Sequence, residues 1–248
     1  MPSLFDATIA ATFTALATGI GALPFVFVKQ FPLVLARWAW AAAAGLMLSA
    51  STFNLIFPGV QDGGITPVAI GILLGTLLMA ATSNWLEDRD IQFQGLSGAG
   101  AKRIILVLVT LFIHSFPEGI AVGVAYGSGE VGLGLLMAVA IAIHNIPEGL
   151  AVGLPLRAGG IGGWQSVGWA IFSSVPQILA AIPAYLAVVA FRPLLPYAFG
   201  FAAGAMIFLV MSELLPESQP TRESRLPSAL VGMGGFLAMM VLQNLLVF

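Results

Sequence analysis

The chain has no cysteine, and charged residues make up only 8% of its 248 positions. Without cysteine it has neither a disulfide framework nor thiolate metal ligands, and its composition carries no sign of a redox compartment. With so few charges and 59% hydrophobic residues, the chain cannot form the surface of a water-soluble globule. The net charge is −2, and no nucleic-acid partner is expected. The composition therefore predicts a membrane protein surrounded by the lipid bilayer.

Long apolar runs predict an all-α membrane protein with eight transmembrane helices. A hydrocarbon core about 30 Å thick requires roughly 20 apolar residues per helix, and eight runs reach that length. The start of the chain, 1–6, lacks the positive region of a cleaved signal peptide, so the first run is expected to be a retained helix. One transmembrane domain, 1–248, is expected, with helices near 7–28, 33–57, 65–86, 104–127, 131–154, 166–191, 194–215 and 227–248.

Lysine and arginine are unevenly distributed among the connections between these eight runs. The chain has nine such residues, and all except Arg192 fall in the first, third, fifth and seventh connections, when Arg37, at the membrane edge of the run 33–57, is counted with the first. An excess of Lys and Arg in short loops marks the cytoplasmic side of a membrane. Both termini are therefore expected to lie outside the cell.

The central feature of the sequence is a His-x-x-Pro-Glu-Gly motif that occurs twice, thirty residues apart. His114 and Glu118 form one pair, and His144 and Glu148 form the other. Residues four apart share one face of a helix, so each pair can reach a single ion. Because ionisable groups are costly at membrane depth, two matched pairs in apolar runs make an ion pathway the default hypothesis.

The order of the apolar runs gives the duplicated motif an inverted symmetry. Consecutive spans run antiparallel, so copies in spans four and five are related by an axis in the membrane plane. A fainter match relates spans two and seven, where Asn54 follows Met47 by seven residues and Glu213 follows Met206 by seven. Spans 1–3 and 6–8 are therefore expected to be inverted copies around the central pair, in a 3+2+3 arrangement.

The residue types of the motif suit a divalent cation as transported substrate, with no catalytic cofactor. Two imidazoles and two carboxylates would balance its charge, and nitrogen and oxygen ligands fit zinc, iron(II), manganese, cobalt or cadmium. The absence of cysteine argues against copper(I), although Met47 could add one soft contact. In a purely structural alternative, Pro117 and Pro147 kink two packed helices and each His/Glu pair satisfies itself, but two inverted copies at one depth disfavour it.

The stretches 114–119 and 144–149 resemble the paired H-N-x-P-E-G signatures of the ZIP family of divalent-metal transporters. Gly-Ala-Leu-Pro at 21–24 and Ser-Glu-Leu-Leu-Pro at 212–216 also fit, and the first run is similar to the bacterial GufA-like branch. The resemblance implies a helical transporter that moves zinc or a related cation toward the cytoplasm by alternating access. It also implies a homodimer in a bacterial plasma (inner) membrane.

Carried over by motif position, the resemblance implies a primary metal site and a weaker secondary one. Ser115 stands where the family usually has asparagine, Gln177 stands where many members have a glutamate, and Asn145 is retained. One full-strength site and at best a weak second are therefore expected. The histidine-rich tract usual in the third connection is missing. The implied metal ligands are His114, Glu118, His144 and Glu148, with Met47 as an extra ligand, and Ser115, Asn145 and Gln177 for the second site.

Two other functions share this ligand chemistry. The alternative from a different class is an intramembrane metal-dependent hydrolase, which needs an open coordination position and a separately placed base. Here both glutamates of the motif are used as symmetric ligands, which counts against that alternative. A metal exporter of another fold also stays open, because the ligands alone do not set the direction of flux.

Overall fold

The computed structural model describes residues 2–28, 32–87 and 99–246, and this part of the chain consists of helices and turns without a strand. Within it, seven helical runs are long and apolar enough to cross a membrane. The basic residues Lys29 and Arg89 lie outside the described residues. Inside helices, the description also leaves out the side chains of Ala36, Trp85, Leu86, Glu87, Ala99, Ala101, Lys102, Arg103, Leu106, Val107, Thr110, His114, Val131, Ala151 and Leu246.

The helices follow one another in eight consecutive runs. In chain order these are α1 (Leu4–Ala22) with α2 (Pro24–Phe27); α3 (Leu33–Ala50), η1 (Ser51–Ile56) and α4 (Phe57–Gly63); α5 (Ile65–Glu87); α6 (Ala99–Gly127); α7 (Val131–Ala158); α8 (Gly163–Ser173) with α9 (Val175–Ala190); η2 (Arg192–Leu194), α10 (Leu195–Leu209), η3 (Val210–Leu214) and α11 (Leu215–Ser218); and α12 (Arg222–Leu246).

Prolines act differently in different runs. The first and sixth runs are interrupted just before a proline, since α2 begins at Pro24 and Pro176 lies in the first turn of α9. Proline fits the first turn of a helix because its missing N–H would have no partner there anyway. Pro117 and Pro147, by contrast, lie inside α6 and α7, which continue through them. The motif prolines therefore do not end the helices that carry the motif.

The second and seventh runs share a local departure from α geometry. Each contains a π-helical segment, η1 and η3, and each segment begins four residues after a buried methionine, Met47 or Met206. Asn54 lies in η1 and Glu213 lies in η3. π-helical turns are rare and are often found at functional sites. The short sequence match between these runs thus coincides with the same unusual backbone at the same offset.

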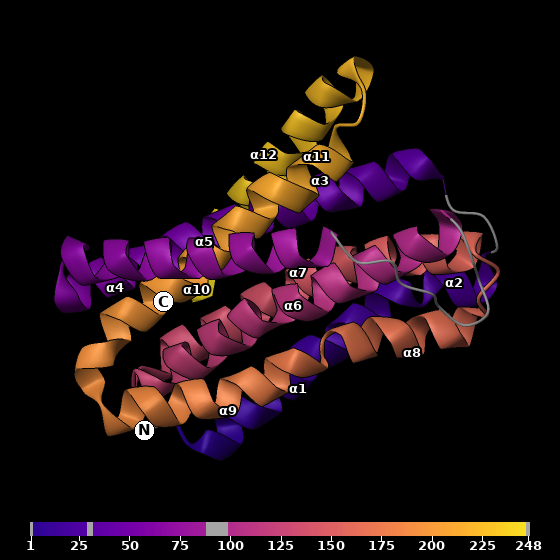
Figure 1. Ribbon diagram of the computed structural model, residues 1–248. Coiled ribbons are helices and arrows are strands. Elements are labelled where there is room, and N and C mark those ends of the chain that lie inside the picture. Colours follow the sequence, from indigo (N-terminus) through magenta and orange to yellow (C-terminus); the bar gives the residue numbers. More distant parts are fainter. Residues whose placement is uncertain (1, 29–31, 88–98, 247–248) are drawn as a thin grey trace.

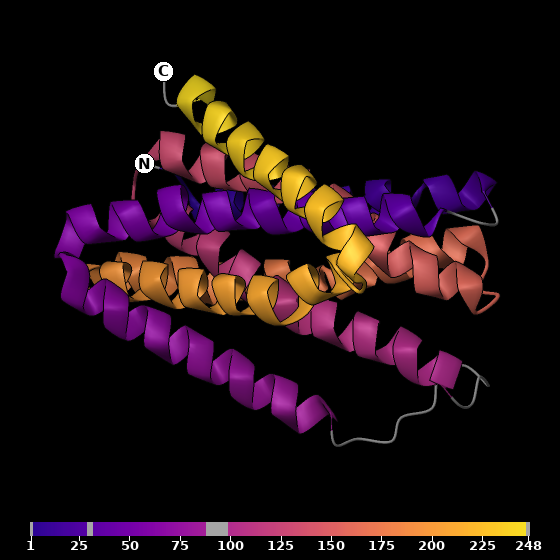
Figure 2. The ribbon, with the colours of Figure 1, turned by 90° about the horizontal axis from the view of Figure 1, so that it is seen from above.

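The helices are arranged in pairs around α6 and α7, which lie against each other in the middle of the bundle (Figure 1). α1 packs on α7, and α9 packs on α6. α3 also contacts α7, and α10 contacts α6. The outermost pairs are α5 on α10 and α12 on α3, where α12 crosses α3 obliquely (Figure 2). The main buried apolar cluster unites side chains of α1, α3, α6, α7, α9 and α10.

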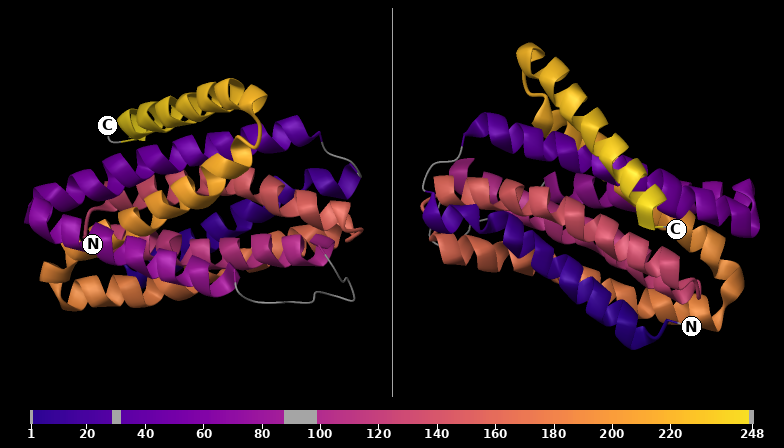
Figure 3. Two further views of the ribbon diagram at one scale, coloured as in Figure 1. Left: turned by 45° about the horizontal axis from the view of Figure 1, so that its top comes forward. Right: turned by 180° about the vertical axis from the view of Figure 1, so that it is seen from behind.

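The two termini lie at the same end of the elongated bundle in every view (Figures 1 and 3). α2 and the connection from α7 to α8 lie at the opposite end. α12 remains on the outside of the bundle, and large apolar side chains of α5 and α12, such as Leu73 and Leu230, are exposed. Such faces suit contact with lipid, whereas the motif residues Glu118, His144 and Glu148 are buried among the other helices.

Candidate metal centre

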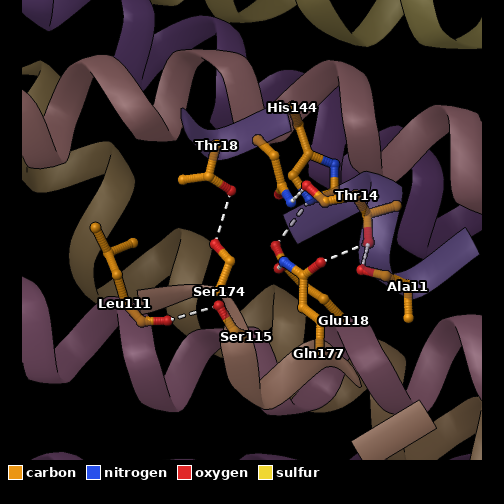
Figure 4. Close-up of polar contacts among 10 residues, drawn as sticks. Ala11, Thr14, Thr18, Leu111, Ser115, Glu118, His144, Ser174 and Gln177 are labelled. Carbon is orange, nitrogen blue, oxygen red and sulfur yellow. Dashed lines mark hydrogen bonds and ion pairs between the residues drawn. The ribbon is translucent and has the colours of Figure 1, made fainter. Parts of the chain in front are cut away.

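Glu118 of α6 and His144 and Glu148 of α7 form a compact buried group between the two central helices. Each offers one ligand atom, and these atoms all lie within 4.8 Å of one another. Nε2 of His144 is 2.8 Å from Oε1 of Glu118. The exposed fractions of the three residues are 0%, 0% and 2% for Glu118, His144 and Glu148. Figure 4 shows Glu118 and His144 pointing toward each other across the helix pair.

The local backbone explains why these side chains meet. His144 and Glu148 are one turn apart on α7, which runs uninterrupted through Pro147, so both lie on the same helix face. The packing of α6 against α7 then brings Glu118 to that face. Two buried carboxylates without compensation would be expensive, so a group of this kind needs hydrogen bonds, protons or a cation.

The spacing of the group suits a transition-metal ion. A tetrahedral zinc ion with bonds of about 2.1 Å separates its ligand atoms by roughly 3.4 Å. The observed range, from 2.8 Å between Glu118 and His144 to a limit of 4.8 Å for the whole group, brackets that separation. The spacing of the three atoms is therefore compatible with one shared ion.

A chain of hydrogen bonds connects Glu118 to α9 and α1. The side-chain nitrogen of Gln177 donates to Oε2 of Glu118. Oε1 of the same amide is 2.6 Å from the hydroxyl of Thr14, which is also 2.8 Å from the carbonyl oxygen of Ala11. Gln177 and Thr14 are both buried. Glu118, His144 and Glu148 are called the metal-type group below. Gln177, predicted for the secondary site, contacts this group by its hydrogen bond to Glu118 (Figure 4).

Asn145 also binds α1. Its side-chain nitrogen donates to the backbone carbonyl of Thr14 at 2.8 Å, which fixes the orientation of the amide. Among the described residues, Oδ1 of Asn145 and Nδ1 of His144 are buried and have no hydrogen-bond partner. A buried amide oxygen without a donor is unusual, and it remains available as a ligand.

The other predicted ligands, Ser115, Met47 and His114, are not part of the three-residue group among the described side chains. Ser115 is buried, but its hydroxyl donates to the carbonyl of Leu111 in its own helix, and it is not part of the three-residue group. Met47 is fully buried in the main apolar cluster, together with Val122 and Ile141 of the two central helices. The backbone of His114 belongs to α6, but its side chain lies outside the described residues.

Sequence reasoning missed the polar residues of α1. Thr14 binds both Gln177 and Asn145, and Thr18, one turn later, shares a 2.7 Å hydrogen bond with Ser174. The signal was weak: two threonines four residues apart in an apolar run lie on one helix face. Nothing local shows that their partners lie in the fifth and sixth runs.

The fold and the buried group define a polytopic helical membrane protein with a site of metal-ligand composition at its centre. A family model described as ZIP zinc transporter matches residues 87–243. Zinc transporter ZIPB of Bordetella bronchiseptica is 37% identical over 243 residues, which cover 93% of this chain and 78% of that protein. Zinc transporter GufA of Myxococcus xanthus is 32% identical over 226 residues, covering 85% and 87%.

The chain therefore belongs to the ZIP zinc transporter family. A protein of Arabidopsis thaliana named putative zinc transporter is 43% identical over 209 residues, but these span 82% of this chain and only 33% of that protein. Membership makes the chain a divalent-metal transporter and not an enzyme, so the hydrolase alternative loses its support.

Proposed function

We propose that this protein carries zinc, or a closely related divalent cation, toward the cytoplasm through a site formed by Glu118, His144 and Glu148. The observation that carries the proposal is the enclosure of one imidazole and two carboxylates within 4.8 Å of one another between α6 and α7. Two carboxylates balance the charge of one divalent ion, and mixed nitrogen and oxygen ligands suit zinc. The names of the bacterial relatives support zinc as cargo.

His114 is proposed as a fourth ligand of the same ion. It lies four residues before Glu118 in α6, the spacing that His144 and Glu148 have in α7. Asn145 and Gln177, with Ser115 at the motif position, are proposed for a weaker second subsite, which the unpartnered Oδ1 of Asn145 supports. For Met47, burial in the apolar cluster supports a neighbouring position but assigns no bond to metal.

We further propose eight membrane spans in a 3+2+3 arrangement of inverted repeats, with α6 as the span added to the seven apolar runs. α6 is 29 residues long and packs along α7. The paired contacts support the symmetry. An inverted repeat relates span four to five, one to six, two to seven and three to eight. Each main helix contact then has a symmetry-related contact, or is its own counterpart, as α6 with α7 is. The pair α1 and α7 becomes α9 and α6, and the pair α5 and α10 becomes α12 and α3.

The distribution of charge supports an orientation with both termini outside. Arg37 lies in the first turns of α3, Arg157 in the last turn of α7, and Arg222 at the start of α12. These ends belong to connections that face away from the termini in the eight-span plan, whereas Arg192 belongs to η2 on the side of the termini. The excess of basic residues marks the cytoplasmic side.

Alternating access is proposed between two groups of helices. α1, α6, α7 and α9 pack on one another around the metal-type group, and α3, α5, α10 and α12 form the second group through the pairs α3 with α12 and α5 with α10. The groups meet where α3 contacts α7 and α10 contacts α6. A homodimer and a bacterial inner membrane remain expectations from the family resemblance.

Zinc uptake into sealed proteoliposomes tests the proposed site. Glu148→Gln and His144→Ala should each lower uptake by about 100-fold or more, since even losing an outer-shell partner of a metal ligand costs about 10–100-fold in affinity. Glu130→Gln is the matched control, because Glu130 is an exposed carboxylate at the start of α7. Gel filtration and thermal unfolding confirm that each variant folds. Uptake at the wild-type rate by either site variant would refute the proposal, and flux measured in intact cells separates import from export.

A further inference from the structure

Gln177 lies between two different hydrogen-bonding groups, and the chemistry of each end of its amide matters. Its NH₂ donates to Glu118, and its carbonyl oxygen is 2.6 Å from the hydroxyl of Thr14. An NH₂ group carries only donors, whereas the amide oxygen is an acceptor and a metal ligand. In this orientation the amide hydrogens stabilise the Glu118 carboxylate, but they would repel a cation bound beside it.

The hydroxyl of Thr14 can satisfy the amide in either orientation. A threonine hydroxyl has one proton and two acceptor positions. In the observed orientation, that proton faces both the Gln177 oxygen, at 2.6 Å, and the Ala11 carbonyl, at 2.8 Å. If the amide turned by half a rotation, its NH₂ would donate to the Thr14 oxygen, while the Thr14 proton would go to Ala11 alone. Both orientations therefore leave the Thr14 hydroxyl hydrogen-bonded, but the second removes the NH₂ donor from Oε2 of Glu118 and turns the amide oxygen toward that carboxylate, which requires a cation between them.

We propose that Gln177 exchanges between two amide orientations as the site takes up a cation, and that Thr14 is the positioning residue that stabilises both. In one orientation the NH₂ donates a hydrogen bond to Glu118. In the other, the amide oxygen faces the cation and the NH₂ rests on Thr14. The proposal rests on the metal site put forward above and adds a residue of α1 that has no ligand role of its own.

The surroundings of Thr14 restrict it to this role. Its side chain is buried, with an exposed fraction of 1%, and its backbone carbonyl accepts a hydrogen bond from Asn145 at 2.8 Å. The residue is thus fixed to α7 through its backbone and to α9 through its hydroxyl. Because the backbone of Thr14 is held in place, its hydroxyl oxygen can keep its position while only its proton turns to suit either orientation of the amide.

The proposal predicts that Thr14 acts on metal binding only through Gln177. Zinc affinity of the purified full-length chain is measured at equilibrium by competition with a chelator. Thr14→Val should weaken binding roughly three- to tenfold, the equivalent of one hydrogen bond, whereas Thr14→Ser should restore it. Gln177→Leu should also weaken binding, and adding Thr14→Val to it should cause no further loss, the sign of coupled residues.

Thr12→Val is the control, because the hydroxyl of Thr12 donates only to the Thr8 carbonyl within α1. If Thr14→Val does not fold, Thr14→Ala gives the same comparison. If Thr14→Val lowers zinc affinity equally with and without Gln177→Leu, the proposal is wrong and Thr14 acts by packing alone. Wild-type zinc affinity in Thr14→Val would also overturn the proposal. Glu148→Gln, measured in parallel, distinguishes failure of the proposed metal site from failure of the proposed role of Thr14. If this variant binds zinc normally, the metal site itself is wrong.

Discussion

Glu118 is the residue on which the polar contacts of the centre converge. Its two oxygens face the imidazole of His144, at 2.8 Å, and the amide of Gln177. A fully buried carboxylate depends on such partners, because an uncompensated charge at this depth is strongly destabilising. The side chain at position 177 therefore influences how much positive charge the centre accepts.

Gln177→Glu should raise the number of bound cations. It replaces a donor to Glu118 with a second carboxylate, and two adjacent carboxylates repel each other unless a proton or cation lies between them. We expect a metal content closer to two ions per chain, and a larger rise of the unfolding temperature on adding zinc than in the unchanged protein. Elemental analysis and thermal unfolding measure these. Gln165→Glu, on the exposed side of α8, adds the same charge as a control, and unchanged stoichiometry would count against the idea.

The sequence predicted a metal site that includes Glu118, His144 and Glu148, and the structure brings these three side chains into one buried group, whose binding of metal stays a prediction. His144 and Glu148 were recognisable because four-residue spacing on one helix is a local property. Glu118 joined them because its motif copy is nearly identical. Thr14 was not recognisable, since it contacts Gln177 across 163 residues of sequence and threonine is common in helices for many reasons. Which residues face each other between helices depends on the packing of the whole bundle.

At the scale of helices, close contact between α1 and α7 positions Thr14 beside Asn145. Gly149 and Gly21 make this possible, because a Cβ at Gly149 would collide with the Thr18 carbonyl, and one at Gly21 would collide with the Ile146 carbonyl. Small residues allow helix backbones in membranes to approach closely. Run lengths predicted these helices, but they could not predict the π-helical segments, because those depend on backbone hydrogen-bond register.

Gly149→Ala should therefore separate α1 from α7. The added methyl meets backbone atoms that cannot rotate away, so we expect a loss of about 1–3 kcal/mol of stability, as for other overpacked interiors, together with slower zinc uptake. Gly168→Ala is the matched control, because no atom lies within 4 Å of the position its Cβ would take. Thermal unfolding in detergent compares the two variants. Equal unfolding temperatures for them would show that the contact is not tight.

At the scale of the molecule, the sequence predicts part of the helix arrangement, and the rest depends on contacts between helices far apart in the chain. The doubled motif and the alternation of basic residues predicted two central helices and an orientation. The packing of α5 on α10 and of α12 on α3 was not predictable, since no sequence signal selects one partner among several apolar helices. The proposed topology therefore needs a test that is independent of the site.

The absence of cysteine makes that test direct, because any cysteine introduced is the only one in the chain. With eight spans and both termini outside, exposed positions in the second and fourth connections, Gln61 and Glu130, lie outside, whereas Ala158 and Glu223, in the fifth and seventh, lie inside. A membrane-impermeant maleimide should label Gln61→Cys and Glu130→Cys in intact cells, but Ala158→Cys and Glu223→Cys only after permeabilisation. The reverse pattern would invert the orientation, and labelling of Glu130→Cys and Ala158→Cys from one side would mean that α7 does not cross the membrane.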